Sequence, residues 1–319
     1  MTTSNSPKLS IIIPVKESNQ NLDECIKHCL ELDYPDYEII VLPDSSIEMS
    51  YNVKIVLTGA KGPSEKRNIG IKEAAGEIIA FLDDDAFPSK SWLGNAIKNF
   101  SDEEVGAVGG PAVTPDNDSL KEKASGIIYS SLLGGGVYRY RYIPHKRLFV
   151  DDFPSCNFIV RKSVLKETGG FKTKFWPGED TVLCLEIIKK TGKKIVYDPS
   201  ALVYHHRRSL FIPHLKQVCN YALHRGYFVK RFPQTSFRIS YFLPTLFVFG
   251  LLSGWLAGFI YPVLYKIYFI SIFVYFSIAL LTGAKNKSPL TVFSGLVLTH
   301  LCYGIWFLKG LFSRRLKEE

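Results

Sequence analysis

The chain has 319 residues, a formal net charge of +9 and 46% hydrophobic residues, which is enough for one large domain with an appendage. Its six cysteines are Cys25, Cys29, Cys156, Cys184, Cys219 and Cys302. They form no CxxC pair and stand at no zinc spacing, so the pattern excludes a cysteine-based zinc site and indicates reduced thiols.

The positive charge belongs to one part of the chain. Residues 1–198 hold 28 of the 30 Asp and Glu and 25 of the 39 Lys and Arg, and are therefore net acidic. Residues 199–317 contain 14 Lys and Arg and no Asp or Glu, although they are also the most apolar part. Because the polar N-terminus leads straight into a strand with no signal peptide before it, we expect the N-terminal domain to stay in the cytoplasm.

Apolar runs alternate with amphipathic segments along the first part of the chain. We expect strands at residues 9–15, 37–42, 53–57, 77–82 and 105–108, and helices at 21–32, 64–75 and 91–100. Strand and helix in alternation predict a mainly parallel sheet that is covered by helices.

The pattern loosens after Pro111. Residues 112–150 contain three consecutive glycines and a Tyr- and Arg-rich run at 138–142, which is typical of a mobile loop over a site or of a nucleic-acid platform. The net acidic charge of the domain favours the loop. Regular structure then resumes, with strands at 158–160 and 194–197 and helices at 163–167 and 180–190.

The strand at 77–82 ends in three consecutive carboxylates, Asp83, Asp84 and Asp85. Open α/β sheets bind ligands beyond the carboxyl ends of their strands. Three adjacent acids repel one another and need a counter-charge, which a divalent cation carrying a nucleotide diphosphate would supply. A solvated acidic turn is the alternative.

Six short motifs follow one another in a recognisable order. They are Ile11-Ile-Ile-Pro-Val15, Asp44, Lys66-Arg67-Asn68-Ile69-Gly70, Leu82-Asp-Asp-Asp85, Gly169-Gly-Phe171 and Gly178-Glu-Asp180. Over about residues 8–200 the series resembles family 2 glycosyltransferases. The resemblance implies the GT-A fold, an α/β Rossmann-like fold whose mainly parallel sheet has helices on both faces, and a nucleotide-sugar donor.

The resemblance also implies a donor site at the ends of the strands. Asp44 would accept from the base or ribose, and Arg67 suits bidentate contact with phosphate. The residues expected to bind the donor are Pro14, Val15, Glu17, Asp44, Lys66, Arg67, Asn68, Asp83 and Asp84. A UDP-sugar is the default donor from family frequency alone.

The same resemblance implies a metal site and a catalytic base. The family's Asp-x-Asp pattern maps to Asp83 and Asp85, with Asp85 on a Mg²⁺ or Mn²⁺ ion and His205 as a third ligand. Inverting transfer needs one base to take the acceptor's proton, and the family places it at Asp180, beside Glu179. Capping of a helix N-terminus is the alternative role for these two acids.

A further set of residues is expected on the acceptor or phosphate side: Asn157, Trp176, Arg207, Arg208, Gln217 and Arg225. For the two consecutive arginines, a basic patch facing the membrane is the alternative. The segment around residue 217 lacks the Gln-x-x-Arg-Trp sequence of processive polysaccharide synthases, which favours single additions.

The last third contains hydrophobic blocks at 239–260, 267–283 and 289–308, each close to the ~20 residues that cross a bilayer. Arg238 before the first block and Lys285 and Lys287 after the second fit the positive-inside rule. Lys309, Arg314 and Arg315 break that rule if the third block spans, so this block either violates the rule or is re-entrant or interfacial.

We therefore expect a GT-A domain at 1–203, a basic amphipathic interfacial segment at 204–238 and a membrane region at 239–319 with two or three helices. The predicted function is inverting transfer of a sugar to a lipid-linked acceptor, a polyprenyl phosphate or lipid-linked saccharide, at the cytoplasmic membrane face for cell-surface glycan synthesis. Membrane lipids are the other expected partners, and nucleic acid is not one. The alternatives are a processive polysaccharide synthase, an inactive membrane scaffold and a nucleotidyltransferase.

Overall fold

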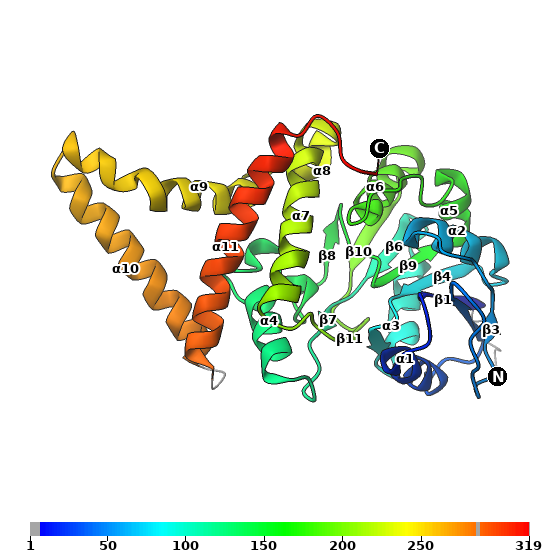
Figure 1. Cartoon of the computed structure of the whole chain (residues 1–319). Coiled ribbons are helices and arrows are strands. Elements are labelled where there is room, and N and C mark those ends of the chain that lie inside the picture. Colours follow the sequence, from blue (N-terminus) through cyan, green and yellow to red (C-terminus); the bar gives the residue numbers. More distant parts are fainter. Residues whose placement is uncertain (1–6, 285–287, 319) are drawn as a thin grey trace. The chain divides into compact units, whose positions relative to one another are not determined.

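The structure is a computed structural model that describes residues 7–284 and 288–318 (Figure 1). The sequence-predicted Lys285 and Lys287 lie outside these ranges. The chain divides into two compact units, described separately below. Unit 1 comprises residues 1–113 and 143–205, and unit 2 comprises 114–142 and 206–317.

Unit 1 is built on an eight-stranded sheet in the order β3-β2-β1-β4-β9-β6-β10-β8. The strands are β1 (Leu9–Pro14), β2 (Tyr37–Leu42), β3 (Lys54–Ile55), β4 (Ile78–Leu82), β6 (Val105–Gly109), β8 (Leu148–Val150), β9 (Asn157–Arg161) and β10 (Lys194–Tyr197). Strands β3, β2, β1 and β4 pair in parallel, as do β6 and β10, whereas β9 runs antiparallel to both β4 and β6. The predicted α/β fold with a mainly parallel sheet is confirmed.

Helices cover both faces of this sheet because successive strand residues point to opposite sides. Ile11 and Ile13 of β1 share a core with α1 (Gln20–Leu30) and α3 (Trp92–Lys98). A short 3₁₀ turn (Asn99–Ser101) follows α3 directly. Ile12 points the other way, onto Gly70 of α2 (Pro63–Glu73), where a Cβ would lie 2.7 Å from its side chain. The other helices of unit 1 are α5 (Lys162–Thr168) and α6 (Glu179–Glu186), the latter continued by a π-helical turn (Ile187–Thr191).

A second, three-stranded sheet has the order β5-β11-β7. It consists of β5 (Ala86–Pro88), β11 (Val203–His205) and β7 (Ala112–Val113). The antiparallel register of β11 on β5 sets His205 opposite Ala86, the residue after Asp85. The sequence analysis did not predict this sheet, although it links a distant histidine to the carboxylate triplet.

The expectation of a mobile loop at residues 112–150 is wrong. This segment contains α4 (Leu120–Ser130), a 3₁₀ helix (Gly136–Arg141) and the strand β8. Helix α4 begins at a capping box, in which the Ser119 side chain accepts from the Glu122 backbone and Glu122 binds back to the Ser119 N–H. Such reciprocal caps satisfy donors that a helix end otherwise leaves unpaired.

Unit 2 joins α4 to the C-terminal helices: α7 (Ile212–Arg231), α8 (Pro233–Ser236), α9 (Ile239–Ser253), a 3₁₀ helix (Gly254–Phe259), α10 (Val263–Ala284) and α11 (Pro289–Phe312). Three segments, 239–259, 263–284 and 289–312, are long and apolar enough to cross a membrane. Figure 1 shows α7 and α11 side by side, and their mutual contacts agree.

A buried polar chain ties three helices of unit 2 together. His214 of α7 is fully buried between Ser125 of α4 and Thr299 of α11, at 2.7 Å and 2.9 Å from their hydroxyl oxygens. Burial lowers the pKa of His214 to about 4, so the ring is neutral at physiological pH.

This histidine should make the folded state sensitive to acid. Its pKa is lower in the folded chain (about 4) than the ordinary value of 6.5, so the unfolded state binds more protons as the pH falls from 6.5 towards 4. We expect unfolding free energy to drop over that window by up to about 3 kcal/mol, at 1.36 kcal/mol per pKa unit. Thermal melting of the detergent-solubilised protein between pH 7 and pH 4 would measure it. His214→Gln should flatten this dependence, and an unchanged pH slope in that variant would contradict the assignment.

Candidate active site

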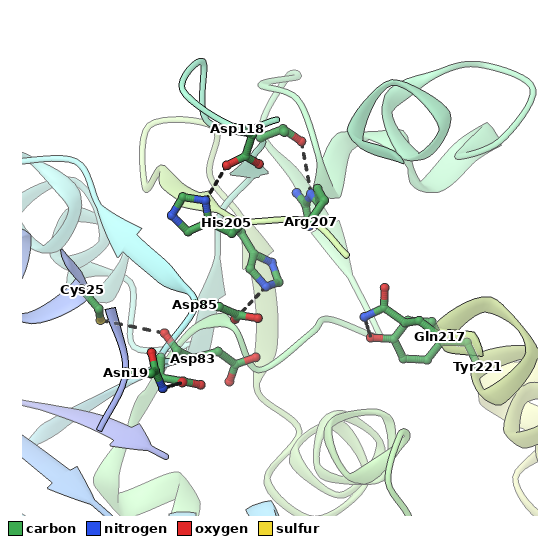
Figure 2. A network of polar contacts seen from close by, with 12 residues as sticks. Asn19, Cys25, Asp83, Asp85, Asp118, His205, Arg207, Gln217 and Tyr221 are labelled. Atoms are coloured by element: carbon green, nitrogen blue, oxygen red, sulfur yellow. Dashed lines mark hydrogen bonds and ion pairs between the residues drawn. The ribbon is translucent and has the colours of Figure 1, made fainter. Parts of the chain in front are cut away.

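Three potential ligands converge at the carboxyl end of β4. Asp83 and Asp85 follow that strand, and the β5–β11 pairing adds His205, whose Nε2 lies 3.0 Å from Asp85 Oδ1. One ligand atom from each residue lies within 4.8 Å of the others. Figure 2 shows the three side chains pointing toward one another. These are the three residues that the sequence analysis named as metal ligands.

The chemistry of this set suits a divalent cation. Carboxylate oxygens are the preferred ligands of Mg²⁺ and Mn²⁺, and imidazole nitrogen is accepted by Mn²⁺. Asp83 and Asp85 repel one another, so a cation between them would relieve their repulsion. The three half-buried side chains therefore fit a metal that carries a phosphate ligand.

A single buried guanidinium connects this cluster to the next functional segment. Arg67, in α2, is 3% exposed; it donates to Asp83 Oδ1 at 2.8 Å and to Glu179 Oε1 at 2.9 Å. Its guanidinium also lies over the Phe171 ring, 5.5 Å from the centroid. Burial acts to lower the pKa of Arg67, but the charges of Asp83 and Glu179 outweigh it and hold the pKa above its ordinary value.

Glu179 and Asp180 open α6 and occupy different environments. Gly178 precedes them with φ +121°, a backbone conformation that residues other than glycine rarely adopt. Glu179 is 5% exposed; burial and the neighbouring charge of Asp180 raise its pKa to about 7, and Arg67 opposes this rise. Asp180 is half-buried and accepts from the Thr181 N–H at 2.7 Å. The geometry therefore separates a buried, ion-paired acid from a more accessible one.

A second buried cation holds the ends of β1 and β2. Lys66, 4% exposed, pairs with Asp44 and donates to the carbonyl oxygens of Val15 and, at 3.1 Å, Leu42. Val15 is buried and follows Pro14, whereas Glu17 is exposed. Lys66 thus ties Asp44 to the strand ends that the sequence analysis assigned to the donor base.

Asp84 accepts from Asn19 Nδ2 at 2.8 Å. Burial raises the pKa of Asp84 to about 6; the Asn19 hydrogen bond opposes the rise, and the charges of Asp85 and Asp83 add to it. Asn19 also caps α1 by accepting from the Leu22 N–H. The sequence analysis missed Asn19, whose only signal was an Asn just before a helix, an ordinary capping pattern.

Two residues predicted to contact substrate hold the fold of unit 1 together. The Asn68 amide both donates to Phe171 O at 2.7 Å and accepts from Phe171 N at 2.9 Å, so it anchors the Gly169-Gly-Phe171 turn. Asn157 is fully buried; it accepts from Trp92 Nε1 at 2.8 Å and donates to Ala201 O at 2.8 Å and Pro111 O at 3.3 Å. Contact of either residue with donor or acceptor stays a prediction.

The remaining acceptor-side predictions fall in both units. Trp176, in unit 1, is 63% exposed just before α6. In unit 2, Arg207 donates to Thr114 Oγ1 at 3.2 Å and lies over the Tyr142 ring, and Arg208 is exposed. Gln217 accepts from the Tyr129 hydroxyl at 3.2 Å, and Arg225 lies 4.7 Å from the Tyr241 ring centroid. Their roles toward an acceptor stay predictions.

Replacing Asn157 should cost stability rather than acceptor binding. Asn157→Ala removes the partner of the Trp92 N–H and of Ala201 O in the core, each worth about 1–3 kcal/mol, whereas Pro111 O keeps its bond from the Val203 N–H. We expect a loss of at least about 2 kcal/mol in unfolding free energy, with an unchanged KM for acceptor in whatever protein remains folded. Denaturant unfolding and steady-state kinetics would measure both, with the exposed Asn52→Ala as control. A raised acceptor KM at unchanged stability would contradict this expectation and support the predicted acceptor contact.

Comparison with known proteins gives this site its context. A model of the family "Glycosyl transferase family 2" matches residues 10–169. A pre-mycofactocin glycosyltransferase of Mycobacterium tuberculosis (strain H37Rv) is 31% identical over 150 residues, which are 47% of this chain and 31% of that protein. The chain thus matches about a third of the length of that relative.

A second relative aligns along nearly its whole length. It is the dolichyl N-acetyl-α-D-glucosaminyl phosphate 3-β-D-2,3-diacetamido-2,3-dideoxy-β-D-glucuronosyltransferase of Methanococcus voltae, 25% identical over 95% of this chain and 97% of that protein. Among solved structures, the mannosyltransferase PcManGT from Pyrobaculum calidifontis in complex with GDP-Man and Mn²⁺ superposes with a TM-score of 0.59 at 17% identity. That match covers 98% of this chain and 89% of the other, and it supports the GT-A fold. Because the family model covers half of the chain, this chain belongs to glycosyl transferase family 2.

Proposed function

We propose that this protein is an inverting, metal-dependent glycosyltransferase that moves one sugar from a nucleotide sugar to a lipid-linked acceptor at the cytoplasmic membrane face. The observation that carries the proposal is the bridge made by Arg67. One guanidinium holds Asp83, on the donor and metal side, and Glu179, beside the proposed base, at 2.8 Å and 2.9 Å. A donor bound at Asp83 and a base at Asp180 would thereby be held at a fixed separation, as a displacement reaction requires.

The donor would lie across the strand ends. Asp44, held by Lys66, would accept from the base or ribose, and Asp83 would accept from the ribose. A Mg²⁺ or Mn²⁺ ion held by Asp83, Asp85 and His205 would neutralise the diphosphate as it leaves. Because the leaving group would then need no proton, the protein has to supply only a base.

Asp180 is the residue we assign to that base. It would take the proton of the acceptor hydroxyl while that oxygen forms a bond to the anomeric carbon. The bond between the anomeric carbon and the diphosphate oxygen breaks, and its electron pair leaves with the nucleoside diphosphate. Glu179 is buried and paired with Arg67, so we assign it a positioning role.

The acceptor class is inferred from the membrane segments and from relatives. Three helices of this chain are apolar enough to cross a bilayer, and a soluble acceptor would not need a site held at the membrane. The Methanococcus voltae relative is named for action on a dolichyl phosphate-linked sugar. We extend that class, a sugar or phosphate on a polyprenyl lipid, to this chain.

The transfer reaction makes one prediction. Purified protein with Mn²⁺ and membrane lipid extract should release nucleoside diphosphate from one donor among UDP-, GDP- and dTDP-sugars, and release should depend on lipid. Asp180→Asn should lower kcat by about 10²–10⁴ with donor binding retained, since only the base is lost. Glu103→Gln, at an exposed position, removes the same single negative charge and serves as control. If no donor in the panel releases nucleoside diphosphate and calorimetry detects no donor binding, the inactive scaffold is favoured. Release of pyrophosphate would indicate a nucleotidyltransferase.

A separate prediction concerns the metal site and is tested by measuring Mn²⁺ binding. His205→Ala removes one of three ligands, so Mn²⁺ affinity in the presence of nucleoside diphosphate should fall at least about tenfold, equal to 1.4 kcal/mol. Electron paramagnetic resonance of free Mn²⁺ would measure it. The exposed His145→Ala is the matched control. Equal affinity in both variants would remove His205 from the metal site.

A further inference from the structure

The third apolar helix of unit 2 differs from the other two in what surrounds it. A third of the apolar window of α11 is buried (33%), against 17% for residues 239–259 and 11% for α10. Helix α7 covers much of α11. A Cβ on Gly226 would lie 2.0 Å from Phe307 O, and one on Gly310 would lie 2.0 Å from Leu223 O. Backbones this close leave no room for lipid between the two helices.

The two helices also run in the same direction over a long stretch. His214, in the first turn of α7, bonds Thr299, and Gly226, near its end, packs on Phe307. The Lys230 ammonium then donates to Ser313 O at 2.7 Å, just past the end of α11. If α11 stood across a membrane, α7 would therefore stand beside residues 299–312 at a similar depth.

Helix α7 is unsuited to a hydrocarbon environment. It exposes Lys216 in its second turn, Asn220 one turn later, and Lys230 and Arg231 at its end. Charged groups within the bilayer core cost several kcal/mol each unless they reach the interface. If α11 crossed the membrane, its partner α7 would carry these groups into the core with it.

The exposed side of α11 carries an apolar stripe, bordered one turn after Ile305 by the exposed Lys309. Leu298, Ile305 and Phe312 are 37%, 49% and 75% exposed and are spaced seven residues apart, on one face of the helix. The buried residues Val292, Leu296, Thr299 and Phe307 lie on its other side. One packed face and one apolar stripe are typical of a helix that lies in the membrane interface.

Helix α10 has the opposite character. Only 11% of its apolar window is buried, and the exposed residues Ile267, Phe269, Ile270, Phe273 and Val274 cover nearly half of its circumference, a far wider face than the stripe of α11. So broad an uncovered apolar surface suits a lipid-surrounded span.

Helix α11 contacts the part of the hairpin where the chain enters it and the half of α10 where the chain leaves it. Gly304 packs on Pro244 and Val248 of α9, His300 lies 2.7 Å from the Tyr275 hydroxyl in the middle of α10, and Val292 packs on Gly283 at the end of α10. The chain enters the hairpin near the contact of Gly304 and leaves it at the contact of Val292, so these two contacts belong to the same side of the membrane.

We propose that α9 and α10 cross the membrane as a hairpin, and that α11 does not cross but lies along the lipid surface with Leu298, Ile305 and Phe312 against it. Arg238, before the hairpin, and Lys309, Arg314 and Arg315, around the end of α11, then stand on one side. All these charges obey the positive-inside rule with that side cytoplasmic, which three crossings would not allow.

Reporters on the full-length chain test this topology. Green fluorescent protein fused after Glu319 should fluoresce, and alkaline phosphatase fused there should be inactive, because each works on only one side of a bacterial membrane. Tyr261→Cys, at the turn between α9 and α10, should react with a membrane-impermeant maleimide on intact cells, with the unaltered chain as background. Active phosphatase at the C-terminus would show that α11 crosses, and an unreactive Tyr261→Cys would show that the hairpin does not cross.

A pair of matched substitutions provides an independent reading. Ile305→Lys places a charge at the interface and should leave the amount of protein in the membrane fraction nearly unchanged, whereas Phe273→Lys places one within a span and should lower it severalfold. An equal loss from both variants would overturn the proposal. Neither readout requires catalysis, so the result stands apart from the proposed sugar transfer.

Discussion

The site of this protein depends on a buried arginine that two acids share. Arg67 is 3% exposed, and its two ion pairs reach Asp83 after β4 and Glu179 at the start of α6. Removing either carboxylate would leave the buried guanidinium with only one ion-pair partner. Loss of one partner from a buried ion pair strongly lowers the free energy of unfolding. The ends of two elements nearly 100 residues apart in sequence are thereby held together, and the proposed donor and base positions with them.

The buried polar groups differ between the two units: they are charged at the strand ends of unit 1 and neutral in the helix contacts of unit 2. In unit 1, Lys66 and Arg67 hold carboxylates at the strand ends, where a divalent cation would compensate the remaining negative charge and carry the nucleotide. In unit 2, the neutral His214 links three helices through hydroxyl groups, without any formal charge. The first arrangement suits binding of a charged ligand, whereas the second suits a helical unit whose surroundings include lipid.

Family likeness and local geometry contributed differently to the site. The family's Asp-x-Asp pattern led to Asp83 and Asp85, and likeness to other GT-A enzymes suggested His205; the structure brings these three together. For Asn68 and Asn157 the structure shows roles within the fold that residue type alone does not reveal. Their hydrogen bonds to Phe171, Trp92 and Ala201 occupy both ends of each amide.

Patterns of local origin could be read from the sequence alone: alternating strands and helices, the carboxylate triplet after β4, and three apolar blocks all depend on neighbouring residues. What required the tertiary structure was every pairing between distant segments. The register of β11 on β5 brings His205 to Asp85, the capping box of Ser119 starts a helix where a loop was expected, and the packing of α7 against α11 covers one side of an apolar block. Hydrophobicity records how apolar a segment is, but the partner that covers it is decided only when the chain folds.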